Sequence, residues 1–329
     1  MTSSVAAPGI DAAIAWHYGD PLREQRALAE HAGLVDRSNR DVLQVTGVDR
    51  LDWLHTICSQ YLSNLPDGAA TEALVLSPHG HVEQHWQVAE LGGTVWIDTE
   101  PGAAPTVLDY LQKMRFLKRV EPVDVSADWA VLSLVGPETA GVLSRAGLPV
   151  PETGHVRPLD IGGFVRRMGW PASDAADLVV ARERAADVTA RLHAAGASAA
   201  GSWAFEALRV QARRPRLAFE TDHRTIPHEI GFIGSAVHLD KGCYRGQETV
   251  ARVQNLGKPP RRLVLLHLSG ESDELPEAGT PVESGGRSVG FLGTAVHHHE
   301  LGPVALAVIK RALPDDAELV VGGSPAAID

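Results

Sequence analysis

The chain has 329 residues, of which 44% are hydrophobic and 22% charged, and its formal net charge is −11. These values are ordinary for a globular protein, and the length exceeds one typical domain of about 100–200 residues. Direct nucleic-acid binding is not expected, because it would need a net basic surface. There is no apolar run of about 18 residues and no basic, apolar leader at the N-terminus, so we expect no membrane association and no signal peptide.

The first two thirds of the chain alternate helix and strand signals. Asp20-Pro21 supplies an N-cap and a first-turn proline, which predicts a helix that Gly33 ends, with Leu22, Leu28 and Ala29 on one face. This order of elements predicts an α+β body, with a Gly/Pro-rich crossing between subdomains at 147–163. Strands are predicted at 41–45, 71–98 (a meander), 129–135 and 178–180, and helices at 48–58, 105–117, 137–147, 184–195 and 203–211.

The C-terminal quarter of the chain is predicted to contain strands and turns rather than alternating helices and strands. Short strands separated by Gly and Pro turns are predicted at 262–268, 280–283, 287–296, 304–309 and 318–321. This spacing is typical of a small β-barrel. We therefore predict two domains: a body of two interleaved α+β subdomains over residues 1–255, and a C-terminal β-barrel over residues 256–329.

The two cysteines, Cys58 and Cys243, lie far apart in the sequence. Without an export signal, this pattern predicts reduced thiols in a cytoplasmic protein rather than a disulfide framework. Cys58 shares an apolar helix face with Leu54, which indicates core packing.

Cys243 lies in an octet with two glycines and two cations, Lys241-Gly242-Cys243-Tyr244-Arg245-Gly246-Gln247-Glu248. The glycines permit a tight turn, and the residues from Gln247 onward are predicted to form a helix. Helix N-termini and nearby cations both favour a thiolate over a thiol, so the octet fits a reactive cysteine. Composition alone favours the alternative, a buried cysteine beside a glycine turn.

The octet also opens a locally basic segment. Between residues 241 and 262 there are six cations and one anion, Glu248, and this balance suits a small anionic ligand. The alternative is that the cations are solvated or paired with acidic residues elsewhere. The six are Lys241, Arg245, Arg252, Lys258, Arg261 and Arg262.

The octet resembles the signature of the YgfZ family, folate-binding proteins of the glycine-cleavage T-protein superfamily. The resemblance continues through 249–263 and, upstream, through 32–38, 45–49 and 226–231. It implies three domains in a ring around a central channel that holds tetrahydrofolate. It also implies a role in the assembly or repair of iron–sulfur clusters in client enzymes, with client or assembly proteins as partners. Cys243 would be the functional residue, and a transient cluster on it would need ligands from elsewhere.

The sequence departs from the T-protein pattern at the place where those enzymes carry a pair of aspartates. The matching positions are Gln84 and His85. The alternative function, a folate-dependent aminomethyltransferase of the T-protein type, therefore lacks its obvious proton carrier, and a classical enzyme of that type is not expected. His79, His81 and His85 are not spaced with a carboxylate or cysteine for a metal, and the run His297–His299 is predicted to be a solvated loop.

The resemblance also implies a set of folate contacts. Gln211 replaces a T-protein glutamate, whereas Glu220 and Glu229 match acidic positions of the superfamily. Glu229 is the best candidate for a pterin contact; its alternative is an ion pair with Arg224 or Arg213. The predicted contacts are Glu229, Gln211, Glu220, Lys241, Tyr244, Arg245 and Arg252.

Overall fold

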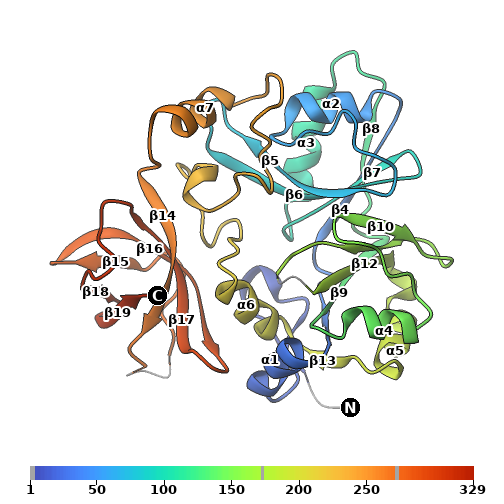
Figure 1. Cartoon of the computed structure of the whole chain (residues 1–329). Coiled ribbons are helices and arrows are strands. Elements are labelled where there is room, and N and C mark those ends of the chain that lie inside the picture. The colour runs from blue at the N-terminus through green and yellow to red at the C-terminus, as the bar shows by residue number, and fades with distance from the viewer. Residues whose placement is uncertain (1–3, 172–173, 271–273) are drawn as a thin grey trace.

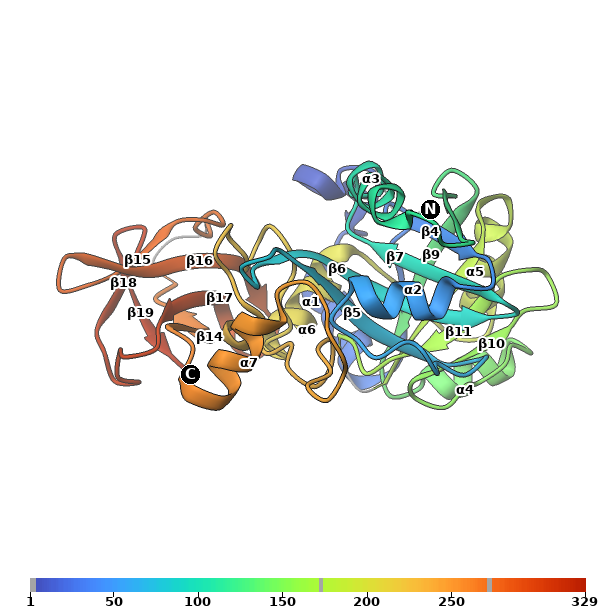
Figure 2. The same ribbon diagram turned by 90° about the horizontal axis from the view of Figure 1, so that it is seen from above.

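The computed structural model describes residues 4–171, 174–270 and 274–329. Two sheets lie on one side of the molecule and a closed barrel on the other, with α6 (Ser202–Gln211) and the following loops between them (Figure 1). Figure 2, seen from above, shows the barrel at one end of the long axis and both sheets at the other. A short two-stranded sheet, β1 (Val5–Ala6) with β2 (Ala15–His17), precedes them.

The first sheet has five strands in the order β5-β6-β7-β4-β8. Its first three strands form the predicted antiparallel meander. Trp53, Leu54 and Cys58 pack with Trp86 of β6 in its core, which confirms that Cys58 is a buried core residue. The elements are β4 (Asp41–Thr46), β5 (Ala70–Leu76), β6 (Val82–Leu91), β7 (Thr94–Thr99), β8 (Glu121–Asp124), α2 (Arg50–Ile57) and α3 (Ala104–Arg115).

The second sheet has six strands in the order β10-β11-β12-β9-β3-β13. The segment 147–163, predicted as a connector, contains one of its strands, β10. Four strands, β3, β10, β11 and β13, were not predicted, because each has only three or four residues. In addition, β3 and β13 pair with strands far away in the sequence. The elements are β3 (Gly33–Asp36), β9 (Trp129–Val135), β10 (His155–Pro158), β11 (Phe164–Arg167), β12 (Ala175–Ala181), β13 (Ser198–Ala200), α4 (Thr139–Arg145) and α5 (Ala185–Ala194).

Helix α1 (Pro21–Glu30) begins as predicted, but it ends before Gly33, which is the first residue of β3, and its buried face is not the predicted one. Glu24, Gln25 and Leu28 are buried, whereas Leu22 and Ala29 are exposed. Glu24 is buried because its carboxylate accepts hydrogen bonds from the backbone N–H groups of Tyr18 and Gly201 at 2.7 and 2.8 Å. Buried polar side chains of this kind are tolerated because they are fully hydrogen-bonded.

The barrel closes in the order β14-β17-β16-β15-β18-β19, and its last strand was not predicted. The predicted domain boundary after residue 255 falls at the end of α7 (Gln247–Leu256). The run His297–His299 is not a solvated loop: His298 ends β16 and is buried, and its Nδ1 accepts from the N–H groups of Glu300 and Leu301. The strands are β14 (Arg261–Leu268), β15 (Pro281–Ser284), β16 (Arg287–His298), β17 (Gly302–Lys310), β18 (Leu319–Val321) and β19 (Ser324–Ile328).

Candidate functional site

The octet is the loop that leads into α7, and it lies against the turn between β5 and β6. Gly246 has φ +83°, and a Cβ there would be 2.5 Å from the carbonyl oxygen of Ser77. A Cβ on Gly80 in the facing turn would be 2.6 Å from the Cβ of Thr249. Both glycines therefore permit a close approach that no other residue allows. Helix α7 begins directly after Gly246, as predicted.

Lys241 anchors the start of the octet to the C-terminal end of α2. Its Nζ donates to the carbonyl oxygens of Cys58 and Gln60, at 2.6 and 2.9 Å, and to that of His55. Burial lowers the pKa of Lys241 to about 8. Its Nζ also lies 4.8 Å from the centre of the Tyr244 ring. The ammonium thus satisfies carbonyls that a helix end leaves without partners.

The two thiols have opposite environments. Cys58 is buried, and burial raises its pKa. Cys243 is exposed, and its neighbour Gly242 has no atom within 4 Å of the position of a Cβ. The composition-based alternative of a buried cysteine is therefore wrong for Cys243. A reagent or partner can reach this thiol without any unfolding of the loop.

A cavity of about 590 Å³ lies between the octet and α7; we call it the octet cavity. Ligand pockets typically measure about 300–1,000 Å³. Two of the predicted contacts, Lys241 and Tyr244, line it. Its wall is otherwise acidic and amide-rich, from Leu239, Asp240, Gln247, Glu248, Val250, Ala251, Gln254 and Asn255.

Most cations of the basic segment are engaged within the protein. Arg245 pairs with Glu83 at 3.0 Å, and Arg262 pairs with Asp315 at 2.5 Å. Arg261 bridges Asp222 and Glu229 at 2.7 and 2.8 Å. With Lys241 bound to carbonyls, only Arg252 and Lys258 of the six make no hydrogen bond or ion pair to described residues, and both are exposed. The segment is therefore not a free basic patch.

The two acidic residues predicted to contact folate, Glu220 and Glu229, are buried and form hydrogen bonds and ion pairs within the protein. Glu229 is buried, caps the N–H of Ile226 at 3.1 Å and pairs with Arg261, not with Arg224 or Arg213 as the alternative had it. Glu220 is fully buried and accepts from Arg209 at 3.0 Å and from the backbone N–H groups of Arg216 and Thr294. Gln211 is exposed at the end of α6. None of these three side chains lines the octet cavity.

A buried acid–base pair lies on the interior face of the first sheet. His85 Nε2 donates to Glu72 Oε2 at 2.9 Å, and Arg214 Nη2 lies 3.5 Å from Glu72 Oε1. Burial opposes the ionisation of Glu72, but the hydrogen bond and charge of His85 and the charge of Arg214 outweigh it and lower the pKa of Glu72. Glu72 was not among the residues predicted from the sequence. Its only signal was an isolated charge within the apolar run 69–76.

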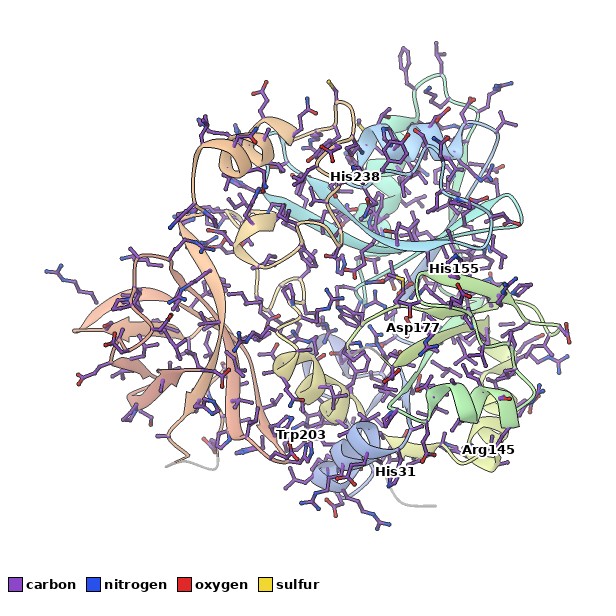
Figure 3. The ribbon with its side chains drawn as sticks, viewed as in Figure 1. His31, Arg145, His155, Asp177, Trp203 and His238 are labelled. Carbon is purple, nitrogen blue, oxygen red and sulfur yellow. The ribbon has the colours of Figure 1, made fainter. Side chains whose placement is uncertain are left out.

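Buried ion pairs join the two sheets. Asp98 of β7 accepts from Arg40 at 2.7 Å and from Arg166 of β11 at 2.5 Å, and Arg166 also reaches Asp177 of β12 at 2.7 Å. Figure 3 shows Asp177 between the two sheets. Despite burial, the arginine charges lower the pKa of Asp98 to about 2 and that of Glu100 to about 2.

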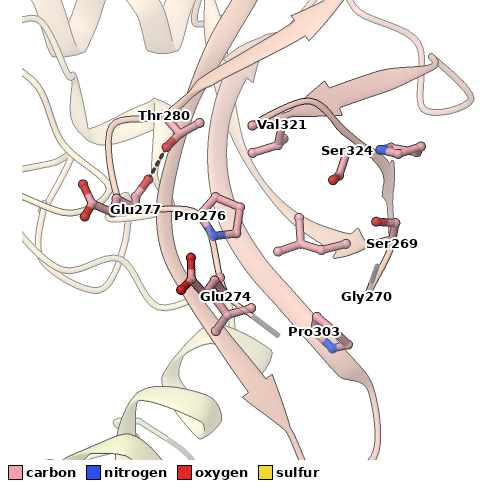
Figure 4. A pocket seen from close by; sticks show the side chains of 13 residues that line it. Ser269, Gly270, Glu274, Pro276, Glu277, Thr280, Pro303, Val321 and Ser324 are labelled. Carbon is pink, nitrogen blue, oxygen red and sulfur yellow. Dashed lines mark hydrogen bonds between the residues drawn. The ribbon is translucent and has the colours of Figure 1, made fainter. Parts of the chain in front are cut away.

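A second cavity, of about 320 Å³, lies on the barrel (Figure 4). Its wall includes Pro276, Pro303 and Val321, with Glu277, whose carbonyl accepts from Thr280 Oγ1 at 2.6 Å. None of the predicted site residues lines it.

Two family models match this chain. The GCVT N-terminal domain matches residues 13–241, and the CAF17 C-terminal beta-barrel domain matches residues 261–328. The chain belongs to the YgfZ/CAF17 family of the GCVT superfamily. The predicted resemblance is thus confirmed. Residues 242–260 of this YgfZ/CAF17 protein, with Cys243 and α7, lie between the two matches.

Relatives and a solved structure are similar to this chain over most of its length. The chain is 28% identical over 313 residues to an aminomethyltransferase of Synechococcus sp. (strain WH7803), covering 89% of this chain and 83% of the relative. It is 27% identical over 340 residues to that of Symbiobacterium thermophilum, covering 93% and 86%. The crystal structure of glycine cleavage system aminomethyltransferase T from Bartonella henselae superposes with a TM-score of 0.88 at 19% identity, over 99% of this chain and 93% of that one.

That superposition confirms the predicted fold, a T-protein-like α+β body with a C-terminal β-barrel. Within residues 4–171, 174–270 and 274–329, no helix of this YgfZ/CAF17 protein is long and apolar enough to cross a membrane. Across the same residues, His, Cys, Asp and Glu side chains form no group of three or more that could hold a metal ion.

Proposed function

We propose that this protein binds a tetrahydrofolate and supports the assembly or repair of iron–sulfur clusters in client enzymes of the cytoplasm, with Cys243 as its reactive thiol. The observation that carries the proposal is the exposed Cys243 on a loop held at both ends, by Lys241 on α2 and by Gly246 on the β5–β6 turn. A held, accessible thiol suits transient transfer, because a single cysteine cannot retain a cluster and must share its ligands with the client.

The octet cavity supports the folate part of the proposal. The pterin amino edge donates hydrogen bonds, and the carboxylates of Asp240 and Glu248 in the cavity wall are acceptors. The ring of Tyr244 offers a stacking surface in the same wall. Arg252, exposed on α7, is available to the anionic glutamate tail. Folate contacts by Glu229, Glu220, Gln211 and Arg245 would first require these side chains to move or leave their present partners.

The test has two arms. Tetrahydrofolate is titrated into the wild type, Cys243→Ala and Glu229→Ala, and we expect binding to survive loss of the thiol. In cells that lack the protein, Cys243→Ala should fail to restore the activity of [4Fe–4S] enzymes, whereas Gly242→Ala, the neighbouring change in open space, should restore it. Normal iron–sulfur enzyme activity with Cys243→Ala would overturn the role of this thiol.

Two observations favour the second candidate, a folate-dependent aminomethyltransferase. The relatives in Synechococcus and Symbiobacterium are named as such enzymes. Glu72 places a buried carboxylate beside His85, where the sequence alone left none. The pair could accept or return a proton during methylene transfer. Turnover of an aminomethyl donor with tetrahydrofolate, lost in Glu72→Gln and retained in Cys243→Ala, would establish this function instead of the first.

A further inference from the structure

The C-terminal end of α3 forms an exposed corner, residues 112–119, which we call the α3 corner. All eight residues are exposed, between buried Leu111 and Val120. Phe116 and Leu117 are consecutive and 89% and 83% exposed, and Met114 is 38% exposed. Single exposed apolar residues are normal, but adjacent large ones mark interaction surfaces.

The α3 corner is also basic in an acidic protein. It contains Lys113, Arg115, Lys118 and Arg119 and no acidic residue. Lys113 pairs with Asp109 and Arg119 with Asp49. Across the described ranges, the side chains of Arg115 and Lys118 take part in no hydrogen bond or ion pair. Two cations thus flank the apolar pair outside any ion pair of the described residues, although the charge of Lys118 also acts on Asp49.

The corner is held in place rather than free. Trp53 Nε1 donates to the carbonyl of Met114 at 2.8 Å, and the N–H of Arg119 donates to Asp49 at 2.8 Å. A Cβ on Gly47 would lie 2.1 Å from the carbonyl oxygen of Arg119, so the chain passes there in close contact. Phe116 has φ 44° and ψ −120°, a backbone conformation that non-glycine residues rarely adopt. Apolar side chains presented on a fixed backbone lose little entropy on binding.

Helix α3, which leads into the corner, contacts the octet through Tyr110. Tyr110, one helical turn before Met114, donates to the carbonyl of Ile57 at 2.7 Å, and its ring lies 5.8 Å from the guanidinium carbon of Arg245. Four residues of helix rise only about 6 Å. The loop between α3 and β8 projects from the same end of the molecule as the loop before α7 (Figure 1).

We propose that the α3 corner docks an acidic partner protein, and that this partner is the iron–sulfur client served by Cys243. The proposal rests on the proposed function. Arg115 and Lys118 would pair with carboxylates on the client, and Phe116 and Leu117 would fill an apolar depression between them. Although the net charge of the protein is −11, the α3 corner presents local positive charge, which is complementary to an acidic protein surface.

The test uses the full-length protein and a purified [4Fe–4S] dehydratase of the same organism, with binding measured at low and high salt. The charge variant is Arg115→Glu/Lys118→Glu, with Arg184→Glu, at the exposed residue just before α5, as its control. The apolar variant is Phe116→Ser/Leu117→Ser, with Ile161→Ser as its control. We expect salt-sensitive binding that weakens at least about tenfold in each double variant and in neither control. The rate of Cys243 labelling should not change.

Absence of binding to the dehydratase, or equal binding by the double variants and the wild type, would refute the α3 corner as a docking surface. Co-sedimentation of the wild type with phosphatidylglycerol-containing vesicles, lost in the double variants, would refute it in favour of a membrane. Failure of the proposed function looks different. In that case the dehydratase still binds through the α3 corner, but Cys243→Ala restores its activity in cells as well as the wild type does.

Discussion

Replacing Gly246 with alanine tests whether the octet is held as the structure indicates. An L-residue at φ +83° costs about 1–2 kcal/mol. The new Cβ would also lie 2.5 Å from the carbonyl oxygen of Ser77 and 3.0 Å from the Cα of Gly80. Because both neighbours are backbone atoms, the loop must shift, and overpacking of this kind adds about 1–3 kcal/mol. We therefore expect Gly246→Ala to reduce the free energy of unfolding by about 2–5 kcal/mol.

Gly242 in the same octet provides the control. Its φ is not in the left-handed region and its Cβ position is in open space, so Gly242→Ala should be neutral or slightly stabilising through the unfolded state. Urea unfolding of both variants, followed by tryptophan fluorescence, gives the two free energies. Labelling of Cys243 should be altered only in Gly246→Ala. Equal stability of the two variants would refute the close approach of the octet to the β5–β6 turn.

Two further predictions concern buried charge. Asp98 and Glu100 have pKa values of about 2 in the fold against ordinary values of 3.8 and 4.5. Their contributions, roughly 2 and 3.5 kcal/mol, are complete above pH 4.5 and lost as the pH falls towards 2. A free energy of unfolding that stays flat from pH 6 to pH 3 would contradict this. Arg261→Met removes the cation that pairs closely with both Asp222 and Glu229 and should cost about 3 kcal/mol. Arg224→Met removes only the 3.9 Å contact of an exposed arginine with Asp222 and should change stability by less than about 0.5 kcal/mol. Similar losses in the two variants would show that the Arg261 bridge is not specific.

The main elements could be read from the sequence because their signals are local. Asp20-Pro21 starts α1, alternating apolar residues mark β5 to β7, and the glycine of the octet precedes α7. Strands such as β13 gave no such signal, because three residues pair with β3 only after the chain has folded. Local patterns likewise indicated which residues of α1 are apolar, but not that Glu24 would be buried by bonds to distant N–H groups.

The site was less predictable than the fold because charge pairing is non-local. Arg261 and Glu229 are 32 positions apart, and nothing in the sequence selects that partner over Arg224. Lys241 could be recognised as a cation near Cys243, but not as the donor to three carbonyls of a helix end. The sequence could not indicate that Glu72 pairs with His85, because the two residues are 13 positions apart and meet only when their strands lie side by side.

The anchor of the octet has an evolutionary consequence. Lys241 binds main-chain carbonyls at positions 55, 58 and 60, and no side-chain substitution there can delete an acceptor. For this contact, the side chains at the three positions can change among homologues, provided that the backbone at the end of α2 keeps the same path. This contact constrains the residue type at position 241 alone. A search for compensating pairs of substitutions would therefore pass over this contact, although it fixes the place of the thiol.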